Sequence, residues 1–220
     1  DKGVRAMILA AAGKNFSAGA DLSWMKRMMG YSYEENLNDA RALAAMLKTL
    51  NSLPVPTVAR VQGGVFGGAV GLVSCCDMAV AASEAGFSLS EVKIGLLPAT
   101  FSPYVIAAIG PRACRRYFMT AERFSADTAA RLGLVSKVVA EEKLDEEVDK
   151  FIDKLLDNSP AAMRGAKQLV FDVAGRKIDD DLIDSTCERI ADIRVSAEGQ
   201  EGLSAFFEKR KPAWRVSKNV

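Results

Sequence analysis

The chain has 220 residues, of which 49% are hydrophobic and 26% are charged. These proportions are typical of a globular protein, and they exclude a disordered or collagen-like chain. With 29 basic and 28 acidic residues the formal net charge is +1, which argues against recruitment of nucleic acid or of an anionic membrane by a global field. Four cysteines without C-x-x-C spacing and no histidine exclude the usual zinc sites and histidine-activated nucleophiles. Proton chemistry must therefore use carboxylates, Lys, Tyr or Cys.

The first part of the chain alternates predicted strands and helices. A nearly continuous apolar run over residues 4–13 is typical of a strand buried on both faces of a mainly parallel sheet. The turn NFSAGAD follows, and Asp21 is a natural N-cap for a helix over residues 22–29. The apolar periodicity from Glu34 to Leu50 predicts a second helix, and PTVARVQG predicts a second strand.

Five glycines lie between Gly63 and Gly71, where the second strand ends. Glycine costs roughly 0.5–1 kcal/mol against alanine within regular structure, so the cluster indicates an unusual backbone shape or a close approach. A nucleotide-phosphate loop is disfavoured, because no register gives G-x-G-x-x-G and Ala69 stands where a P-loop would place lysine. Close packing of a helix on a strand is the plain structural alternative.

The segment after the glycine cluster continues the alternation of helices and strands, which indicates an α/β domain. The elements predicted there are a short buried helix at 69–76, strands at 78–83 and 86–92, a loop from Lys93 into a helix rich in small residues, and a helix with Pro111 as its N1 residue.

The last third of the chain is predicted to be helical. Four amphipathic segments follow one another with hardly a strand signal. We place a boundary near Val139, which separates a sheet-containing core over residues 1–139 from a helical region over residues 140–220. The four segments are marked by Leu144–Leu155, Pro160–Ala174, Leu182–Ile193 and Leu203–Phe207.

Two strand-to-helix junctions share one property. NFSAGADL leads from a buried strand into a helix, so backbone N–H groups near Ala20 lack partners inside that helix. The glycine cluster is a second junction of the same kind. If the two strands are neighbours, two N–H donors can point at one oxygen atom.

Five segments carry a resemblance to a known family: NFSAGADL, GGVFGGAVGL, CCDMAVAASEAGFSLSEVKIGLLP, TAERFSADTAARLGLVSKVV and EGLSAFFEKRKPAW. In this order, from about Val4 to Trp214, they resemble the crotonase superfamily, the enoyl-CoA hydratase and isomerase family. Within it, WMKRM, GGAVGL and SPYVIAAIG are most similar to bacterial methylglutaconyl-CoA and isohexenylglutaconyl-CoA hydratases. The resemblance implies an α/β spiral of ββα turns and a helical C-terminal region, with the opening strand-helix unit of the family missing before Val4.

The resemblance also implies a catalytic site. The backbone N–H groups of Ala20 and Gly68 match the oxyanion hole of the family, which would hold the thioester oxygen of an acyl-CoA. Of the two glutamate positions in the family, one matches Glu91 and the other matches Gly71, where no acid is present. We favour hydration with Glu91 as the principal acid and base, helped by a distal carboxylate of the substrate. An isomerase, a non-catalytic binding protein, and a plain surface role for Glu91 stay open.

Further residues are assigned to the substrate by the same resemblance. Asp21 is interpreted as the N-cap that orients the Ala20 peptide rather than as a catalytic acid. Trp24, Met25 and Met28 are candidates for the acyl pocket, although a stripe of core residues explains their helical spacing equally well. For the basic run Lys209–Lys211, a solvated helix end is a better interpretation than contact with CoA. The CoA-binding candidates are Ala18, Gly19, Ala20, Asp21, Leu22, Gly68 and Lys209, and the acyl-pocket candidates are Trp24, Met25 and Met28.

The partners and location are likewise expectations from the resemblance. It implies a homotrimer, often within a hexamer of two trimers, with CoA bound as part of the substrate and no metal or other cofactor. A glutaconyl-type substrate would belong to leucine or acyclic-terpenoid breakdown. We expect a cytoplasmic bacterial protein, with the mitochondrial matrix as the alternative, and neither a membrane span nor an electrostatic RNA surface.

Overall fold

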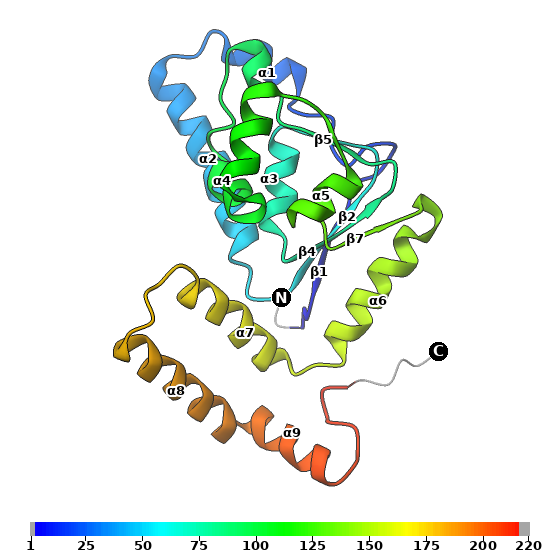
Figure 1. Cartoon of the computed structure of the whole chain (residues 1–220), viewed down its shortest axis with the longest axis vertical. Coiled ribbons are helices and arrows are strands. Elements are labelled where there is room, and N and C mark those ends of the chain that lie inside the picture. Colours follow the sequence, from blue (N-terminus) through cyan, green and yellow to red (C-terminus); the bar gives the residue numbers. More distant parts are fainter. Residues whose placement is uncertain (1–2, 216–220) are drawn as a thin grey trace. The chain divides into compact units, whose positions relative to one another are not determined.

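The computed structural model of the chain describes residues 3–215, which divide into two compact units. The sheet unit comprises Ile8–Leu53 and Thr57–Asp149, and the helical unit comprises the other described residues. Both sheets of the structure are built in the first part of the chain, and the last helices follow them in sequence (Figure 1).

The larger sheet has four strands in the order β1-β2-β4-β7. β2 pairs in parallel with β4, and β4 pairs in parallel with β7. Val58, Ala59 and Val61 of β2 are fully buried, which explains why the strand sequence is apolar on both faces. The expected mainly parallel sheet is thereby confirmed. Its strands are β1 (Met7–Leu9), β2 (Thr57–Val61), β4 (Met78–Ala82) and β7 (Lys137–Val139).

The smaller sheet begins inside the glycine cluster, where the sequence pattern predicts no strand. It has the order β3-β5-β6, with β3 parallel to β5 and β6 antiparallel to β5. A Cβ on Gly63 would lie 2.1 Å from the carbonyl oxygen of Lys14, so the backbone can pass there only as glycine. The strands are β3 (Gly64–Phe66), β5 (Gly86–Ser88) and β6 (Phe124–Ser125).

Five helices belong wholly to the sheet unit. α3 contacts both α2 and α4, and the three lie side by side in Figure 1. α4 is kinked at Gly110, where φ is 77°, so the predicted helix start at Pro111 coincides with the kink. The helices are α1 (Leu22–Met28), α2 (Tyr33–Asn51), α3 (Gly68–Cys75), α4 (Ser102–Thr120) and α5 (Ala126–Leu132).

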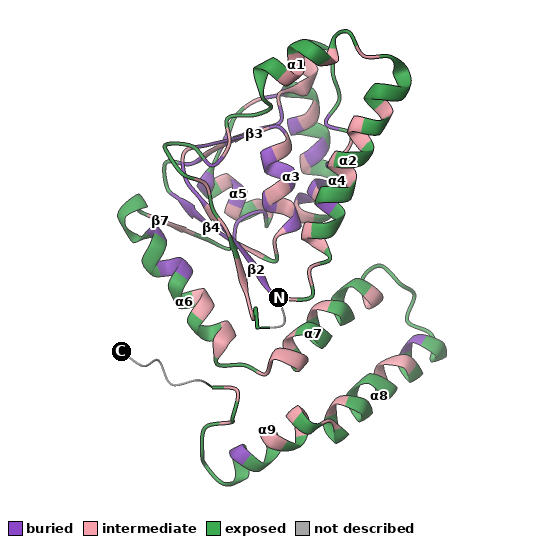
Figure 2. Cartoon of the chain, turned by 180° about the vertical axis from the view of Figure 1, so that it is seen from behind, coloured by how far each residue is buried: buried purple, intermediate pink, exposed green. Residues whose placement is uncertain are grey.

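The core of the sheet unit lies between its strands and helices. Buried residues concentrate on β2, β4, α3 and α4 (Figure 2). Leu47 of α2, Val70 of α3 and Phe87 of β5 are fully buried members of this cluster. Their burial fixes α3, whose first residue is the predicted oxyanion glycine.

The helical unit contains the long amphipathic helices. Arg5 holds its chain ends together, because its guanidinium donates to the carbonyl oxygens of Leu156, Asn158 and Trp214 at 2.8–2.9 Å. Much of α8 and α9 is exposed (Figure 2). The helices that follow β7 are α6 (Leu144–Leu156), which begins in the sheet unit, and α7 (Pro160–Val173), α8 (Asp180–Val195) and α9 (Ala197–Phe207).

Two predicted strands are shorter in the structure. The strand expected over residues 4–13 is confined to Met7–Leu9. The strand expected over residues 86–92 ends at Ser88, and a 3₁₀ helix, η1, spans Glu91–Ile94 before Gly95 closes it in a left-handed conformation. None of residues 4–13 is buried and Ile8 is 44% exposed, so the expectation of a strand buried on both faces is wrong there: β1 is an edge strand of its sheet. Beyond β5, Leu89 is buried although it is not part of the strand.

Three elements after α4, namely β6, α5 and β7, are not assigned from the sequence. Within residues 3–215, no helix combines the length and the apolar character that crossing a membrane requires. The boundary near Val139 between two functional regions stays a prediction.

The packing of α2 on the core gives a first test. Leu47 is fully buried, so Leu47→Ala is expected to lower the free energy of unfolding by about 2–5 kcal/mol, through lost burial and the cavity left behind. Met46→Ala, at a neighbouring side chain that is 47% exposed, is the control and should change it by less than about 1 kcal/mol. Urea unfolding measures both, and equal losses would contradict this packing.

Candidate active site

The two strand-to-helix junctions are joined by backbone hydrogen bonds. The Phe16 N–H donates to the carbonyl of Gln62 at 2.8 Å, and the Ser17 N–H donates to the carbonyl of Gly64 at 3.0 Å. The Phe66 N–H donates back to the carbonyl of Ser17 at 3.0 Å. The NFSAGAD loop therefore runs alongside the glycine cluster.

This pairing is parallel, and its register brings the two predicted oxyanion residues to the same end. Ser17 forms a parallel bridge with Val65. Ala20 lies three residues beyond Ser17, and Gly68 lies three residues beyond Val65. Both chains then turn into a helix. Neither the Ala20 nor the Gly68 N–H has an acceptor among residues 3–215, so both are available to a ligand.

Gly67 directly precedes α3 and sets the backbone conformation at the N-terminus of this helix. This residue is the N-cap, with φ 59° and ψ −125°, and its N–H donates to the carbonyl of Ser88 at 2.9 Å. Such a backbone conformation is strained for any residue with a Cβ. Gly68 is thereby presented as the first residue of the helix, where backbone N–H groups lack intrahelical partners.

Glu91 lies against this junction. Its Oε1 is 2.7 Å from the position that a Cβ on Gly67 would occupy. Its Oε2 is buried and, in the part of the chain that the structure describes, accepts no hydrogen bond. Burial raises the pKa of the Glu91 carboxyl, against a smaller opposing effect of a backbone hydrogen bond within Glu91 itself. The site thus holds a carboxylate beside the Gly67–Gly68 peptide.

Position 71 is the other place where the resemblance leads us to expect an acid. The space beside Gly71 is occupied by Phe101, the N-cap residue of α4. A Cβ on Gly71 would lie 2.4 Å from the Cβ of Phe101, which is only 5% exposed. The sequence reasoning did not identify Phe101 or Gly67 as residues of the site. Gly67 belongs to the glycine cluster, which did signal an unusual backbone, but its contact with Glu91 has no local signal. Phe101 has no local signal either, because its contact with Gly71 joins residues far apart in the chain.

The remaining loop and α1 candidates lie next to Ala20 in sequence. The Oδ1 atom of Asp21 accepts a hydrogen bond from the Trp24 N–H at 2.7 Å, which confirms the predicted N-cap. The Trp24 indole donates to Oδ1 of Asp39 in α2 at 3.0 Å, so it is anchored between helices. Ala18, Gly19 and Ala20 of the loop and Leu22 of α1 are exposed, and Trp24, Met25 and Met28 are half-buried. Their contact with an acyl-CoA stays a prediction.

The basic run at residues 209–211 belongs to the helical unit. The Arg210 guanidinium donates hydrogen bonds to the carboxylates of Glu201, at 2.7 and 2.8 Å, and Glu208, at 2.6 Å. The bonds to Glu201 help to lower the pKa of Glu201 to about 2. Lys209 and Lys211 are exposed. The predicted contact of Lys209 with CoA stays a prediction.

The four cysteines differ in exposure: Cys75 and Cys114 are buried, Cys76 is half-buried and Cys187 is exposed. Cys75 is buried, and burial raises the pKa of its thiol to about 12, so it is not a nucleophile at neutral pH. Within residues 3–215, no three Asp, Glu or Cys side chains are arranged to hold a metal ion. That CoA is the sole bound group stays a prediction.

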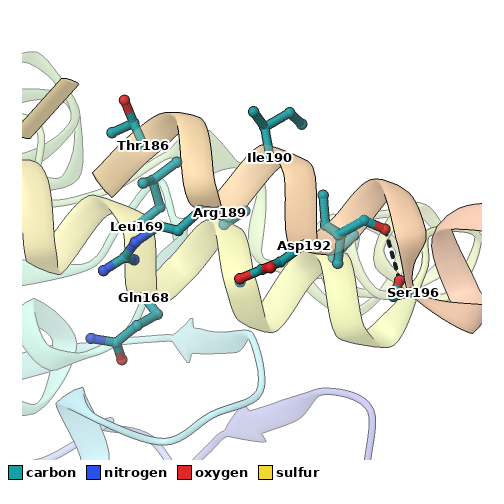
Figure 3. Close-up of a pocket in the computed structure, with 11 residues that line it drawn as sticks. Gln168, Leu169, Thr186, Arg189, Ile190, Asp192 and Ser196 are labelled. Atoms are coloured by element: carbon teal, nitrogen blue, oxygen red, sulfur yellow. Dashed lines mark hydrogen bonds between the residues drawn. The ribbon is translucent and has the colours of Figure 1, made fainter. Parts of the chain in front are cut away.

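A cavity of about 540 Å³ lies in the helical unit between α7 and α8 (Figure 3). Its wall is mixed: Leu169 and Ile190 are apolar, whereas Gln168, Arg189 and Asp192 carry polar groups. Ser196 also lines the cavity, and its hydroxyl donates to the carbonyl of Ile193 at 2.7 Å. None of the predicted catalytic residues lines it.

Comparison with known proteins identifies the class. The enoyl-CoA hydratase/isomerase family matches residues 1–217. The chain therefore belongs to this family, whose fold is the crotonase fold.

Individual relatives agree with this assignment. An enoyl-CoA hydratase from Shewanella pealeana is 50% identical with a TM-score of 0.94, over 97% of this chain and 80% of that one. Pseudomonas aeruginosa AtuE is 34% identical with a TM-score of 0.93, over 98% and 83%. The short-chain-enoyl-CoA hydratase of Clostridium acetobutylicum is 31% identical over 96% of this chain and 80% of its own length. The expected crotonase fold and enzyme class, an enoyl-CoA hydratase-type hydro-lyase, are confirmed.

The contact between Gly67 and Glu91 can be tested by adding one methyl group. Gly67→Ala is expected to lower the free energy of unfolding by about 1–3 kcal/mol, because φ is positive and the new Cβ would meet the Glu91 carboxylate. Gly86→Ala is the matched control, since a Cβ there would meet nothing within 4 Å. Chemical denaturation measures both, and an unchanged Gly67→Ala variant would show that the junction is not constrained in this way.

The raised pKa of Glu91 predicts a pH-dependent stability. The folded protein binds this proton more tightly than the unfolded chain, so the contribution to stability is complete at acidic pH and is lost as the pH rises through the folded-state pKa. The Glu91→Gln side chain does not ionise, so its contribution to stability does not change with pH in this way. We therefore expect the free energy of unfolding of wild type to fall relative to that of Glu91→Gln as the pH rises from about 4 to about 8. A difference that stays constant with pH in urea unfolding would contradict the burial of the charge.

Proposed function

We propose that this chain hydrates a branched α,β-unsaturated acyl-CoA of the 3-methylglutaconyl or isohexenylglutaconyl type. The observation that carries the proposal is the Glu91 carboxylate, half-buried and with one unpartnered oxygen, beside the Gly67–Gly68 peptide. An acid/base group needs such a place: close to the reacting atoms and with a pKa moved toward neutrality.

In the proposed site the N–H groups of Ala20 and Gly68 bind the thioester oxygen. Negative charge grows on this oxygen when water adds to the β-carbon, because the electrons of the double bond move into an enolate. Two fixed N–H donors stabilise that charge, and each is worth about 2.7–4 kcal/mol by analogy with a mutated oxyanion-hole donor. Gly68 suits the role because no side chain stands beside its N–H.

Glu91 serves both proton transfers in this scheme. Its carboxylate removes a proton from water as the water oxygen bonds to the β-carbon. The resulting carboxylic acid then gives a proton to the α-carbon, which completes the addition of water and restores the carboxylate. A distal carboxylate on the substrate assists Glu91 in this hydration.

The second candidate is an enoyl-CoA isomerase. The Glu91 carboxylate lies beside Gly67, and a single carboxylate is sufficient to move a proton from one carbon to another. Isomerisation and hydration use the same oxyanion hole, so the substrate decides between them.

The wider assignment is also a proposal. A hydratase of this type acts in leucine or acyclic-terpenoid breakdown, in the cytoplasm, with CoA bound only as part of the substrate. We propose a homotrimer or a hexamer of two trimers, supported by the large apolar side chains that α8 and α9 expose. These include Ile183, Ile190, Val195, Leu203, Phe206 and Phe207.

The assay follows the conjugated-thioester absorbance with 3-methylglutaconyl-CoA, crotonyl-CoA and a 3-enoyl-CoA. Wild type is expected to consume conjugation with 3-methylglutaconyl-CoA, and Glu91→Gln is expected to lower kcat by about 10²–10⁴-fold because the proton transfers lose their acid and base. Glu84→Gln, at an exposed glutamate in the turn after β4, is the matched control and should retain activity.

Other outcomes of this assay separate the candidates. Appearance of conjugation from the 3-enoyl-CoA would favour the isomerase. Full activity in Glu91→Gln would refute the single-glutamate mechanism. No turnover of any thioester would favour a non-catalytic binding protein of the same fold.

A further inference from the structure

Gln62 is a buried polar side chain of the sheet unit. It lies between β2 and β3 and is only 3% exposed. Burying an amide group costs free energy unless hydrogen bonds replace those that it makes with water. Its Nε2 donates to the carbonyl oxygens of Ala11 at 2.8 Å and Gly13 at 3.1 Å. Its Oε1 accepts a hydrogen bond from Nη1 of Arg60 at 3.0 Å, which fixes the direction in which the amide points.

These two carbonyls belong to the segment that leads into the NFSAGAD loop. β1 ends at Leu9, so Ala11 and Gly13 lie outside the strand, and Gly13 bends the chain with φ 87°. Three residues later the Phe16 N–H donates to the main-chain carbonyl of Gln62 itself at 2.8 Å. The segment from Ala11 to Phe16 is therefore bound to Gln62 at three points, two before the pairing with β3 and one where it begins.

The rest of the loop is held only at its ends. Ser17 pairs with β3, and residues 18–21 that follow are exposed. At the far end Asp21 caps α1 by accepting the Trp24 N–H at 2.7 Å. The position of the Ala20 N–H thus depends on how the chain enters the pairing at Phe16 and Ser17, and Gln62 governs that entry.

We propose that Gln62 is a positioning residue for the oxyanion hole: its amide sets the register in which the loop joins β3 and so aligns the Ala20 N–H with that of Gly68. This inference rests on the proposed function, which assigns both N–H groups to the thioester oxygen. A CoA thioester is a large ligand, and one hydrogen bond to its carbonyl contributes little of its affinity. The same bond matters far more when that oxygen carries the charge of the enolate. Loss of the Gln62 bonds should therefore lower kcat and leave KM nearly unchanged.

Two variants remove the amide donor in different ways. Gln62→Met loses both bonds to the loop and keeps a side chain of similar length. Gln62→Glu keeps the shape and the contact with Arg60, whose guanidinium balances the new charge, but an ionised carboxylate cannot donate to two carbonyls. The second variant covers the case in which the first does not fold.

Thr57→Val is the matched control at the other end of β2. Thr57 is fully buried, and its hydroxyl donates to Oδ2 of Asp77 at 3.0 Å, away from the loop. This variant also loses a buried hydrogen bond, so its Tm should fall, but the entry of the loop into its pairing is unchanged.

The kinetic test follows the loss of conjugated-thioester absorbance with 3-methylglutaconyl-CoA or crotonyl-CoA, whichever wild type hydrates. The Gln62 variants are expected to lose about 10–100-fold in kcat with KM within about threefold, since a donor displaced by about 1 Å is sufficient for such a loss. Thr57→Val should keep kcat within about twofold. Wild-type kcat in the folded Gln62 variants would overturn the proposal, as would an equal loss in Thr57→Val.

A spectroscopic test needs no turnover. Butyryl-CoA is saturated and cannot be hydrated, and hydrogen bonds to its thioester oxygen lower the stretching frequency of the carbonyl. With a ¹³C label at this carbonyl, infrared difference spectra should show the same lowering in wild type and Thr57→Val and a smaller one in both Gln62 variants. A full lowering in the Gln62 variants would contradict the positioning role.

The two proposals can fail separately. If wild type hydrates a thioester and lowers the carbonyl frequency, but the Gln62 variants behave like wild type, the inference about Gln62 is wrong and the proposed function stands. If the lowering depends on Gln62 but no thioester is hydrated, the proposed function is wrong and the positioning role stands. A wild type that binds butyryl-CoA without any lowering would overturn both.

Discussion

The parallel pairing of the NFSAGAD loop with β3 is the constraint on which the site depends. Three backbone hydrogen bonds tie Phe16 and Ser17 to the chain between Gln62 and Phe66. Parallel register carries both chains to the same end before each turns into a helix. A shift of this pairing by one residue would move Ala20 relative to Gly68 and separate two N–H groups that are proposed to share one oxygen atom.

Glu91 is subject to opposing electrostatic effects at this place. It lies beside the first turn of α3, and the partial positive charge of a helix N-terminus favours an ionised carboxylate. Burial favours the neutral acid, and it outweighs the opposing effects, since the pKa is raised. A raised pKa makes the carboxylate a stronger base than a solvated one, which suits a residue that must take a proton from water and then give one back.

The sequence predicts more of the scaffold than of the contacts within the site. The buried strands β2 and β4, the long helix α2 and the Asp21 cap follow from periodicity and capping, because those signals are local. Glu91 was found only through a family resemblance, since a lone carboxylate after a strand has no distinctive pattern. Phe101 was missed because its meaning depends on Gly71, thirty residues earlier in the chain. Tertiary contacts of this kind leave no period and no motif.

The structure gives a different physical reason for glycine at different positions of the cluster. Gly63 is required by the backbone of the preceding loop, because an added Cβ would lie 2.1 Å from the carbonyl oxygen of Lys14, and a Cβ on Gly64 would lie 2.9 Å from the Phe66 ring. Gly67 is required by a positive φ and a neighbouring carboxylate, and Gly71 by an aromatic ring. Gly68 differs, because its φ is ordinary and an added Cβ would make only normal contacts near 4 Å. The contacts within the fold do not demand glycine there, and the absence of a Cβ leaves open space beside the N–H that is proposed to bind the thioester oxygen.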